Sequence, residues 1–154
     1  MTLSVFDAAH YLCKKSEWTL TNLQLQKLLY ICHMFHMGKE KTPLITEEFE
    51  AWDYGPVQPN LYHEIKIYGS APVKNLFHTA KSIEPESSEK AILDNVYEQL
   101  SHRSPAWLVA VTHWEKGAWS KHYRPGSRGV RIPNSEILQE FRARRDAAKQ
   151  KRAA

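Results

Sequence analysis

The 154-residue sequence contains only two cysteines and no long uninterrupted apolar run. Two cysteines are a poor framework for disulfides or for a tetrahedral metal site, so Cys13 and Cys32 are predicted to be reduced core residues. The longest nearly apolar run, residues 28–35, includes His33 and is far shorter than the roughly 20 residues that cross a bilayer. The N-terminus has no basic start and no small-residue cleavage site. The sequence therefore favours a cytoplasmic protein outside the membrane.

Recognisable catalytic motifs are also missing. There is no G-x-S-x-G elbow beside His113, and the glycines form neither a dinucleotide-binding nor a Walker motif. His33 and His36 lie one helical turn apart, but no further metal ligand follows at a diagnostic spacing, so packing or hydrogen bonding is favoured for both. These absences predict a protein that is not an enzyme, with no catalytic residue, no metal and no cofactor.

One acidic stretch, EFEAWDYGPVQPNLY at residues 48–62, invites a paired-carboxylate interpretation. In an extended strand, residues three apart point to opposite faces, so Glu50 and Asp53 should not share a cleft. Glu48 and Glu50 do share a face, and we expect them to be solvated. The Gly-Pro pair at residues 55–56 should end the strand. The stretch is interpreted as a structural corner that leads into the next helix.

The apolar periodicity predicts a mainly α protein, a single compact helical domain of about six helices with one to three short β-strands. The helix that begins near Thr21 carries apolar groups on all sides, so it should be central, and Gly38 should end it. The domain is predicted to span residues 1–141. Residues 142–154 should form a basic tail, the end of the last helix followed by disorder. Further helices are expected from the first residues to about 15, from 59 to 69, from 87 or 88, from 104–105 and from 133–135, with a helical turn at 119–123 and a short strand at 130–132.

The positive charge is concentrated near the C-terminus. Residues 120–154 carry ten Lys or Arg against three acids, whereas the whole chain carries only +4, so residues 1–119 carry −3. Such a patch can meet phosphates, and Trp114, Trp119 and Tyr123 nearby can stack on single-stranded bases. Nucleic-acid binding is therefore the alternative function. A solvated helix end is the plainer interpretation of the same charges.

Three separated segments together resemble one family. They are LQKLLY at residues 25–30, FEAWDYGPV at 49–57 with Pro59 and Tyr62, and VTH at 111–113 followed by Trp119 and Ile132. Over about residues 20–141 the chain is similar to the Panacea domain, also described as SocA-like or phage-associated GepA-like. The resemblance implies an antitoxin, often carried by prophages and mobile elements, which neutralises a protein toxin encoded beside it. It implies no catalytic residues, and the family pairs with unrelated toxins.

The resemblance directs attention to two sets of residues. A binding protein needs exposed aromatic or Arg anchors, although large aromatics in a domain of this size are more often core. The partner would be the cognate toxin, which is either blocked or presented to a host protease. The candidate toxin-binding residues are Trp52, Tyr54, Trp119, Arg124, Arg128 and Arg131. The motif positions expected to be structural are Gln26, Lys27, Leu28, Tyr30, Ala51, Gly55, Pro56, Val57, Thr112 and His113.

Overall fold

The computed structural model describes residues 2–74 and 77–153, and most of that length is helical. Within these ranges no helix has both the length and the apolar content needed to cross a bilayer. The predicted mainly α domain with short strands is confirmed. The described elements are α1 (Val5–Lys15), α2 (Asn22–Glu40), β1 (Phe49–Trp52), β2 (Gly55–Val57), α3 (Pro59–Ile65), the 3-10 helix η1 (Lys66–Tyr68), α4 (Ser88–Leu100), α5 (Pro105–Thr112), α6 (Ala118–His122), β3 (Arg131–Ile132) and α7 (Asn134–Ala153).

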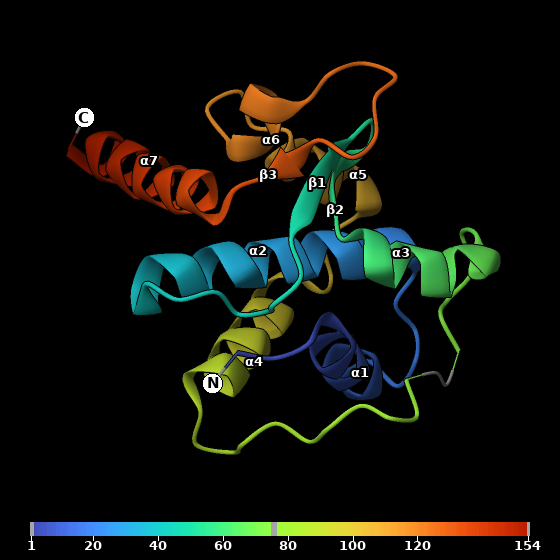
Figure 1. The fold of residues 1–154 in the computed structure, drawn as a ribbon. Coiled ribbons are helices and arrows are strands. Elements are labelled where there is room, and N and C mark those ends of the chain that lie inside the picture. Colours follow the sequence, from blue (N-terminus) through green and yellow to red (C-terminus); the bar gives the residue numbers. More distant parts are fainter. Residues whose placement is uncertain (1, 75–76, 154) are drawn as a thin grey trace.

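Helix α2 is the axis of the fold. It begins with a capping box in which the Thr21 hydroxyl accepts from the Gln24 backbone and the Gln24 side chain accepts from the Thr21 backbone. Every residue from 25 to 34 is buried. Helices α1 and α4 lie on one side of α2, and the sheet and α7 lie on the other (Figure 1). The prediction that this helix is central is confirmed, because its apolar groups find neighbours all round.

Gly38 does not end α2, contrary to the prediction. The helix continues to Glu40, and Lys41 closes it in the left-handed conformation with φ of 63°. A Cβ atom placed on Gly38 would lie only 2.2 Å from the ring of Phe141. Gly38 is therefore needed for close packing, because the missing side chain lets the aromatic ring of α7 rest on the α2 backbone.

The small sheet has the order β2-β1-β3, with both pairings antiparallel. Trp52 pairs with Gly55, so the chain turns at Asp53 and Tyr54. Gly55 and Pro56 thus belong to the return strand instead of ending the extended segment, as the sequence had suggested. On β1, the Phe49 ring meets the Tyr30 ring of α2 edge to face, with ring centres 5.2 Å apart. This contact holds the sheet against the central helix.

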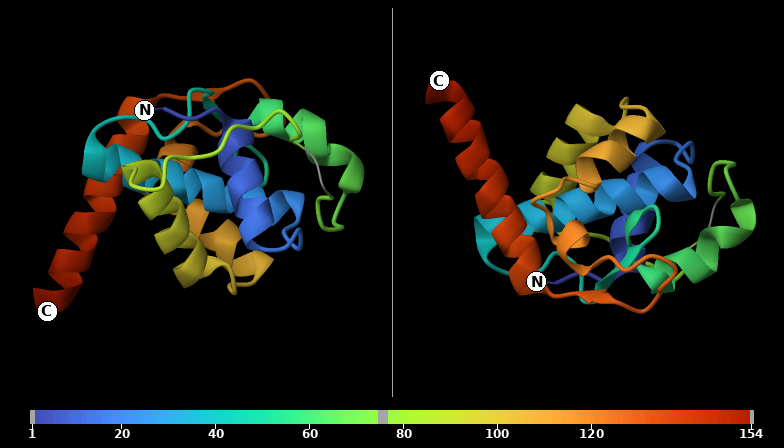
Figure 2. Two further views of the ribbon diagram at one scale, coloured as in Figure 1. Left: turned by 90° about the horizontal axis from the view of Figure 1, so that it is seen from below. Right: turned by 90° about the horizontal axis from the view of Figure 1, so that it is seen from above.

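Helix α7 is longer than the sequence suggested. It continues to Ala153, whereas disorder was expected after the apolar positions ended near Phe141. Arg, Lys, Gln and Ala are all good helix formers, so the segment stays helical without a buried face. Its second half extends away from the rest of the chain in both views of Figure 2. Only Ile137 and Glu140 of this helix are fully buried.

Candidate partner-binding site

The motif residues of α2 hold the return strand of the hairpin. The Gln26 amide oxygen accepts from the Gln58 backbone N–H at 2.8 Å, and its amide nitrogen donates to the Gln58 carbonyl at 3.2 Å. One residue further, Lys27 Nζ donates to the Pro56 carbonyl at 3.0 Å. Gln58 in turn caps α3, its side chain accepting from the Leu61 N–H at 2.9 Å. Strand β2 and the start of α3 are therefore anchored to α2 by side chains from two adjacent motif positions.

Gly55 is the point where three motif segments meet. Its φ of +109° is strained for any residue with a side chain. A Cβ atom at this position would lie 3.0 Å from Lys27 Nζ and 3.1 Å from His113 Nε2. The glycine thus combines an unusual backbone conformation with close approach of two nitrogen atoms, one from Lys27 of α2 and one from His113, the residue after α5.

Lys27 is a buried amine without a carboxylate partner among the described residues. Its relative exposure is 1%, and burial lowers its pKa to about 7. The pKa of His113 is also lowered, first by burial and further by the Lys27 charge, while the Tyr54 backbone raises it. His113 Nε2 is buried with no hydrogen-bond partner within the described part of the chain. Two titratable nitrogens therefore share one poorly solvated place beneath the hairpin.

An aromatic stack continues from His113. The His113 and Trp119 rings stack with centres 3.8 Å apart, and Tyr123 covers Trp119 at 4.6 Å. The Trp119 indole donates to the Trp52 carbonyl at 2.7 Å, and the Tyr123 hydroxyl donates to Asp53 at 2.6 Å. Trp119 is only 9% exposed, and other rings stack against it. It belongs to the core and is not available as an anchor for a partner.

Buried Trp52, only 7% exposed, and exposed Arg128 form a second cluster at the edge of the hairpin. The Arg128 guanidinium carbon lies 4.3 Å from the centre of the Trp52 ring, which meets Tyr62 edge to face at 4.8 Å. The Trp52 indole donates to Glu50 at 2.8 Å, and the Gly129 N–H donates to the same carboxylate oxygen at 3.1 Å. Glu50 therefore positions Trp52 and the loop that carries Arg128.

These residues surround a cavity of about 310 Å³, which we call the motif pocket. Apolar and aromatic walls from the hairpin and α3 face Lys27 and Gln26 of α2, with Arg128 and Tyr54 among its lining residues. Tyr54 is 73% exposed, an unusual exposure for a large aromatic residue. The pocket is lined by Asn22, Leu23, Gln26, Lys27, Trp52, Tyr54, Val57, Tyr62, Gly69, Ser70 and Arg128.

The structure brings together three of the six predicted toxin-binding residues, Trp52, Tyr54 and Arg128. Arg124 is exposed beyond the aromatic stack, where it donates to the Tyr123 carbonyl at 2.9 Å. Arg131 lies on β3 near Glu48, with nitrogen and oxygen 3.8 Å apart, beside a different cavity. Both predicted tryptophans, Trp52 and Trp119, are buried. The exposed members of the predicted set are Tyr54 and Arg128 at the motif pocket and Arg124 and Arg131 elsewhere.

Comparison with known proteins identifies the family. A sequence profile described as "Antitoxin SocA-like, Panacea domain" matches residues 25–120, which is more than half of the chain. The chain belongs to this family. It is also 30% identical over 136 residues to Antitoxin SocA of Caulobacter vibrioides, a match that covers 80% of this chain and 72% of that protein. No solved structure matches significantly.

The family match covers most, but not all, of the residues just described. Lys27, Gly55 and His113 of this Panacea domain lie inside the matched range, as does Tyr54. Arg128 lies outside it. The motif pocket therefore combines residues inside the matched range with Asn22, Leu23 and Arg128 from outside it.

His33, His36 and the two cysteines of this SocA-like chain make ordinary core contacts. His33 Nε2 lies 2.8 Å from Asn134 Oδ1, and the Ile45 N–H donates to His33 Nδ1 at 3.4 Å. His36 Nδ1 donates to the Thr42 carbonyl at 2.6 Å. Cys13 and Cys32 are both free and buried, and burial raises the pKa of Cys13 to about 12. No group of three potential metal ligands occurs within residues 2–74 and 77–153.

The carboxylates of the acidic stretch at residues 48–62 have separate partners. Glu50 accepts from Trp52 and Gly129, whereas Asp53 accepts from Tyr123. Glu50 and Asp53 line different cavities. The two carboxylates therefore lie apart as expected, but the expected reason was wrong, because Asp53 lies in the turn after β1 and not on the strand.

Sequence reasoning missed a buried ionic cluster between α7 and α2. Glu140 is 1% exposed and accepts from the Tyr30 hydroxyl at 2.6 Å and from the Ala118 N–H at 3.0 Å. Arg144 donates to Glu140 at 2.8 Å and to the Val111 carbonyl at 2.6 Å. The i, i+4 spacing of Glu140 and Arg144 was the available signal. This spacing was not sufficient to predict the pair, because Arg144 lies in a strongly basic segment whose charges favour a solvated tail.

Proposed function

We propose that this chain is the antitoxin of a toxin–antitoxin pair and neutralises a cognate protein toxin by direct protein–protein binding. The observation that carries this proposal is the motif pocket, whose exposed Tyr54 and stacked Arg128 stand beside aromatic walls in a chain of the SocA-like family. Tyr, Trp and Arg dominate the energetics of protein interfaces, particularly around pockets. The role requires a binding surface and no catalytic group.

Co-expression tests this proposal. The product of the gene adjacent to this one should arrest growth alone, and the chain should restore growth and co-purify with it. The double variant Tyr54→Ala/Arg128→Ala should weaken binding by about 30-fold or more, as expected for loss of interface anchors. Ile67→Ala is the matched control, because Ile67 is 85% exposed and lies outside the motif pocket. Absence of both rescue and co-purification with the wild-type chain would reject the proposal.

The same experiment separates two routes of neutralisation. If the antitoxin covers the toxin's active site, the cellular amount of toxin should stay constant while growth recovers. If the antitoxin presents the toxin to a host protease, the toxin should disappear more quickly when both are expressed. Immunoblots after translation is stopped measure this difference directly.

Nucleic-acid binding is a second candidate, supported by the six Lys and Arg residues of α7 beyond Phe141. The aromatic part of that hypothesis is weakened, because Trp119 is stacked between His113 and Tyr123. The hypothesis predicts an affinity for single-stranded DNA that falls steeply with salt. The variant Lys149→Gln/Lys151→Gln/Arg152→Gln tests it without disturbing the Glu140 cluster. No binding by the wild type at low salt would reject it.

A further inference from the structure

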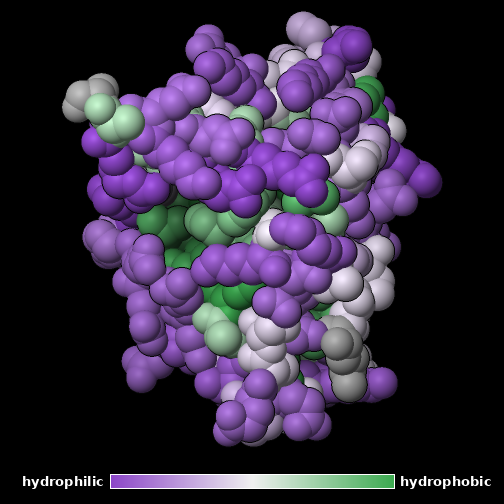
Figure 3. All heavy atoms as spheres, turned by 90° about the vertical axis from the view of Figure 1, so that its left-hand side faces the viewer, coloured by the Kyte–Doolittle hydropathy of each residue, from purple (hydrophilic) through white to green (hydrophobic). Residues whose placement is uncertain are grey.

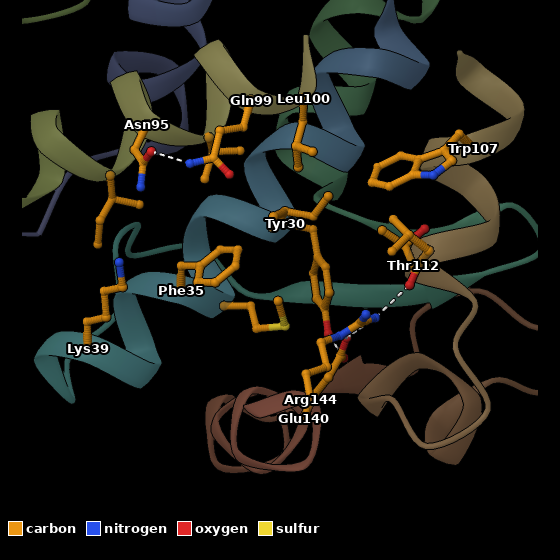
Figure 4. A pocket seen from close by; sticks show the side chains of 15 residues that line it. Tyr30, Phe35, Lys39, Asn95, Gln99, Leu100, Trp107, Thr112, Glu140 and Arg144 are labelled. Carbon is orange, nitrogen blue, oxygen red and sulfur yellow. Dashed lines mark hydrogen bonds and ion pairs between the residues drawn. The ribbon is translucent and has the colours of Figure 1, made fainter. Parts of the chain in front are cut away.

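An apolar groove lies on a different side of α2 from the motif pocket. It has a volume of about 390 Å³ and runs between α4 and α7 across the second half of α2, with α5 at one end. Figure 3 shows apolar side chains gathered in a hollow on the side of the molecule where α7 ends, surrounded by hydrophilic ones. In Figure 4, Phe35 and Lys39 lie on one side, Trp107 and Thr112 on the other, and Tyr30 between them. We call this surface the apolar groove.

The dimensions of the groove suit a helix. Its α2 side runs from Ile31 to Lys39 and its α4 side from Ile92 to Leu100. Each side spans nine residues, or about 12 Å at the helical rise, which is roughly two turns. Leu100, Trp107 and Phe35 are only partly buried, so apolar area remains available for contact. A helix that lies in such a groove contacts it with residues at i, i+3 or i+4, and i+7.

The charges around the groove indicate which residue types the bound helix should carry along its polar edge. Among the described lining residues, Glu140 carries the only carboxylate, and Tyr30 and Arg144 already engage it. Lys39 lies over the Phe35 ring at 5.8 Å and forms no ion pair with another described residue. Beyond the groove, α7 carries Arg145, Lys149 and further basic residues, with Asp146 as its single acid after Glu140. The rim is therefore positive along α7, which favours acidic groups opposite, while the end of α2 adds Lys39 and Lys41 against the single acid Glu40.

We propose that the apolar groove holds an amphipathic α-helix of the cognate toxin, with its apolar side against α2 and α4 and acidic residues along the edge that faces α7. This inference rests on the proposed function. A second copy of this chain is a poorer occupant, because a two-fold contact through this surface would bring two basic α7 helices together. The motif pocket and the groove would then contact separate parts of one toxin.

Affinity measurements with the product of the adjacent gene test the inference. Leu100→Glu places a charge in the apolar groove and should weaken binding by about 30-fold or more. Lys149→Glu, outside the groove, should weaken binding less, and the loss should shrink as salt is raised. Ile67→Glu adds the same charge to an exposed apolar residue elsewhere and should leave affinity unchanged. Circular dichroism and thermal unfolding verify that each variant is folded.

Photo-crosslinking covers the case in which Leu100→Glu fails to fold. A benzoylphenylalanine at position 107 in the full chain should crosslink to the toxin, and the same residue at position 67 should not. If the wild-type chain forms no complex, both the proposed function and this inference fail. If the complex forms, the inference alone is overturned by unchanged affinity of a folded Leu100→Glu variant, by absence of the crosslink, or by a crosslink to a second copy of this chain.

Discussion

The buried Lys27 provides the sharpest test of the site's electrostatics. Its pKa falls from 10.5 to about 7 because burial penalises the ammonium. Between pH 7 and 10.5 the unfolded chain holds a proton at this position that the folded chain does not, so the free energy of unfolding should rise with pH. A depression of this size corresponds to about 4–5 kcal/mol, fully felt below pH 7 and absent above 10.5.

The substitution Lys27→Met removes this penalty but also removes a hydrogen bond. The Pro56 carbonyl would lose the 3.0 Å contact from Nζ, and a buried acceptor left unpaired costs about 1–3 kcal/mol. At pH 7 the variant should therefore be more stable than the wild type by about 1–3 kcal/mol. Near pH 10 the advantage should vanish or change sign. The pKa of His113 should also rise when the neighbouring charge is removed.

Urea unfolding monitored by tryptophan fluorescence at pH 7, 8, 9 and 10 measures the effect. Lys66→Met is the control, because Lys66 is exposed and the same change there should shift the free energy of unfolding by less than about 0.5 kcal/mol at every pH. A Lys27→Met variant that is less stable than the wild type by a constant amount from pH 7 to 10 would refute the reasoning. It would mean that the Lys27 ammonium is well compensated in the folded chain.

Three further predictions concern stability. Burial lowers the pKa of His33 to about 4, and its ring hydrogen bonds need the neutral form. The free energy of unfolding should therefore fall by up to about 3 kcal/mol as pH drops from 6.5 to 4. Urea titrations across that range test this, and His33→Gln should make the free energy of unfolding depend less steeply on pH. Gly55→Ala should destabilise the fold by at least about 2 kcal/mol in thermal unfolding. Gly129→Ala is the control and should cost less, because Gly129 also has a positive φ but has open space around its Cα. Equal losses would contradict the crowding of Gly55 by Lys27 and His113. Glu140→Gln should lower the free energy of unfolding by about 3–5 kcal/mol in denaturant titrations, because it leaves Arg144 without its ionic partner. The double variant Glu140→Gln/Arg144→Met should recover part of that stability. If the losses of the two single variants simply add in the double variant, the two residues do not act as a pair.

The motif pocket and the apolar groove differ in how much of each lies within the family match. The motif pocket is built mostly from residues within the family match, whereas the far side of the apolar groove is formed by α7, which lies outside it. Only two residues of α7 are fully buried, so this helix contributes more surface than core.

The sequence by itself determined the helical class, the central position of α2 and the family. Each follows from local information: apolar spacing around a helix, capping residues such as Thr21 and Ser104, and motif letters that stay recognisable without a structure. It also predicted that Glu50 and Asp53 would not share a cleft, which holds, although the reason differs because Asp53 lies in the turn after β1. Chain order and side-chain period were sufficient for the first three conclusions.

Only the tertiary structure decided which residues meet. Gly38 has the pattern of a helix end, yet it accommodates Phe141 from 103 positions further along the chain. Trp119 is a residue type that often anchors protein interfaces, yet here His113 and Tyr123 stack against it. Lys27 and Arg144 resemble ordinary surface cations, but one is buried beneath Gly55 and the other is paired with buried Glu140. Burial, pKa and pocket shape depend on contacts between distant segments, and no local pattern in the chain specifies these contacts.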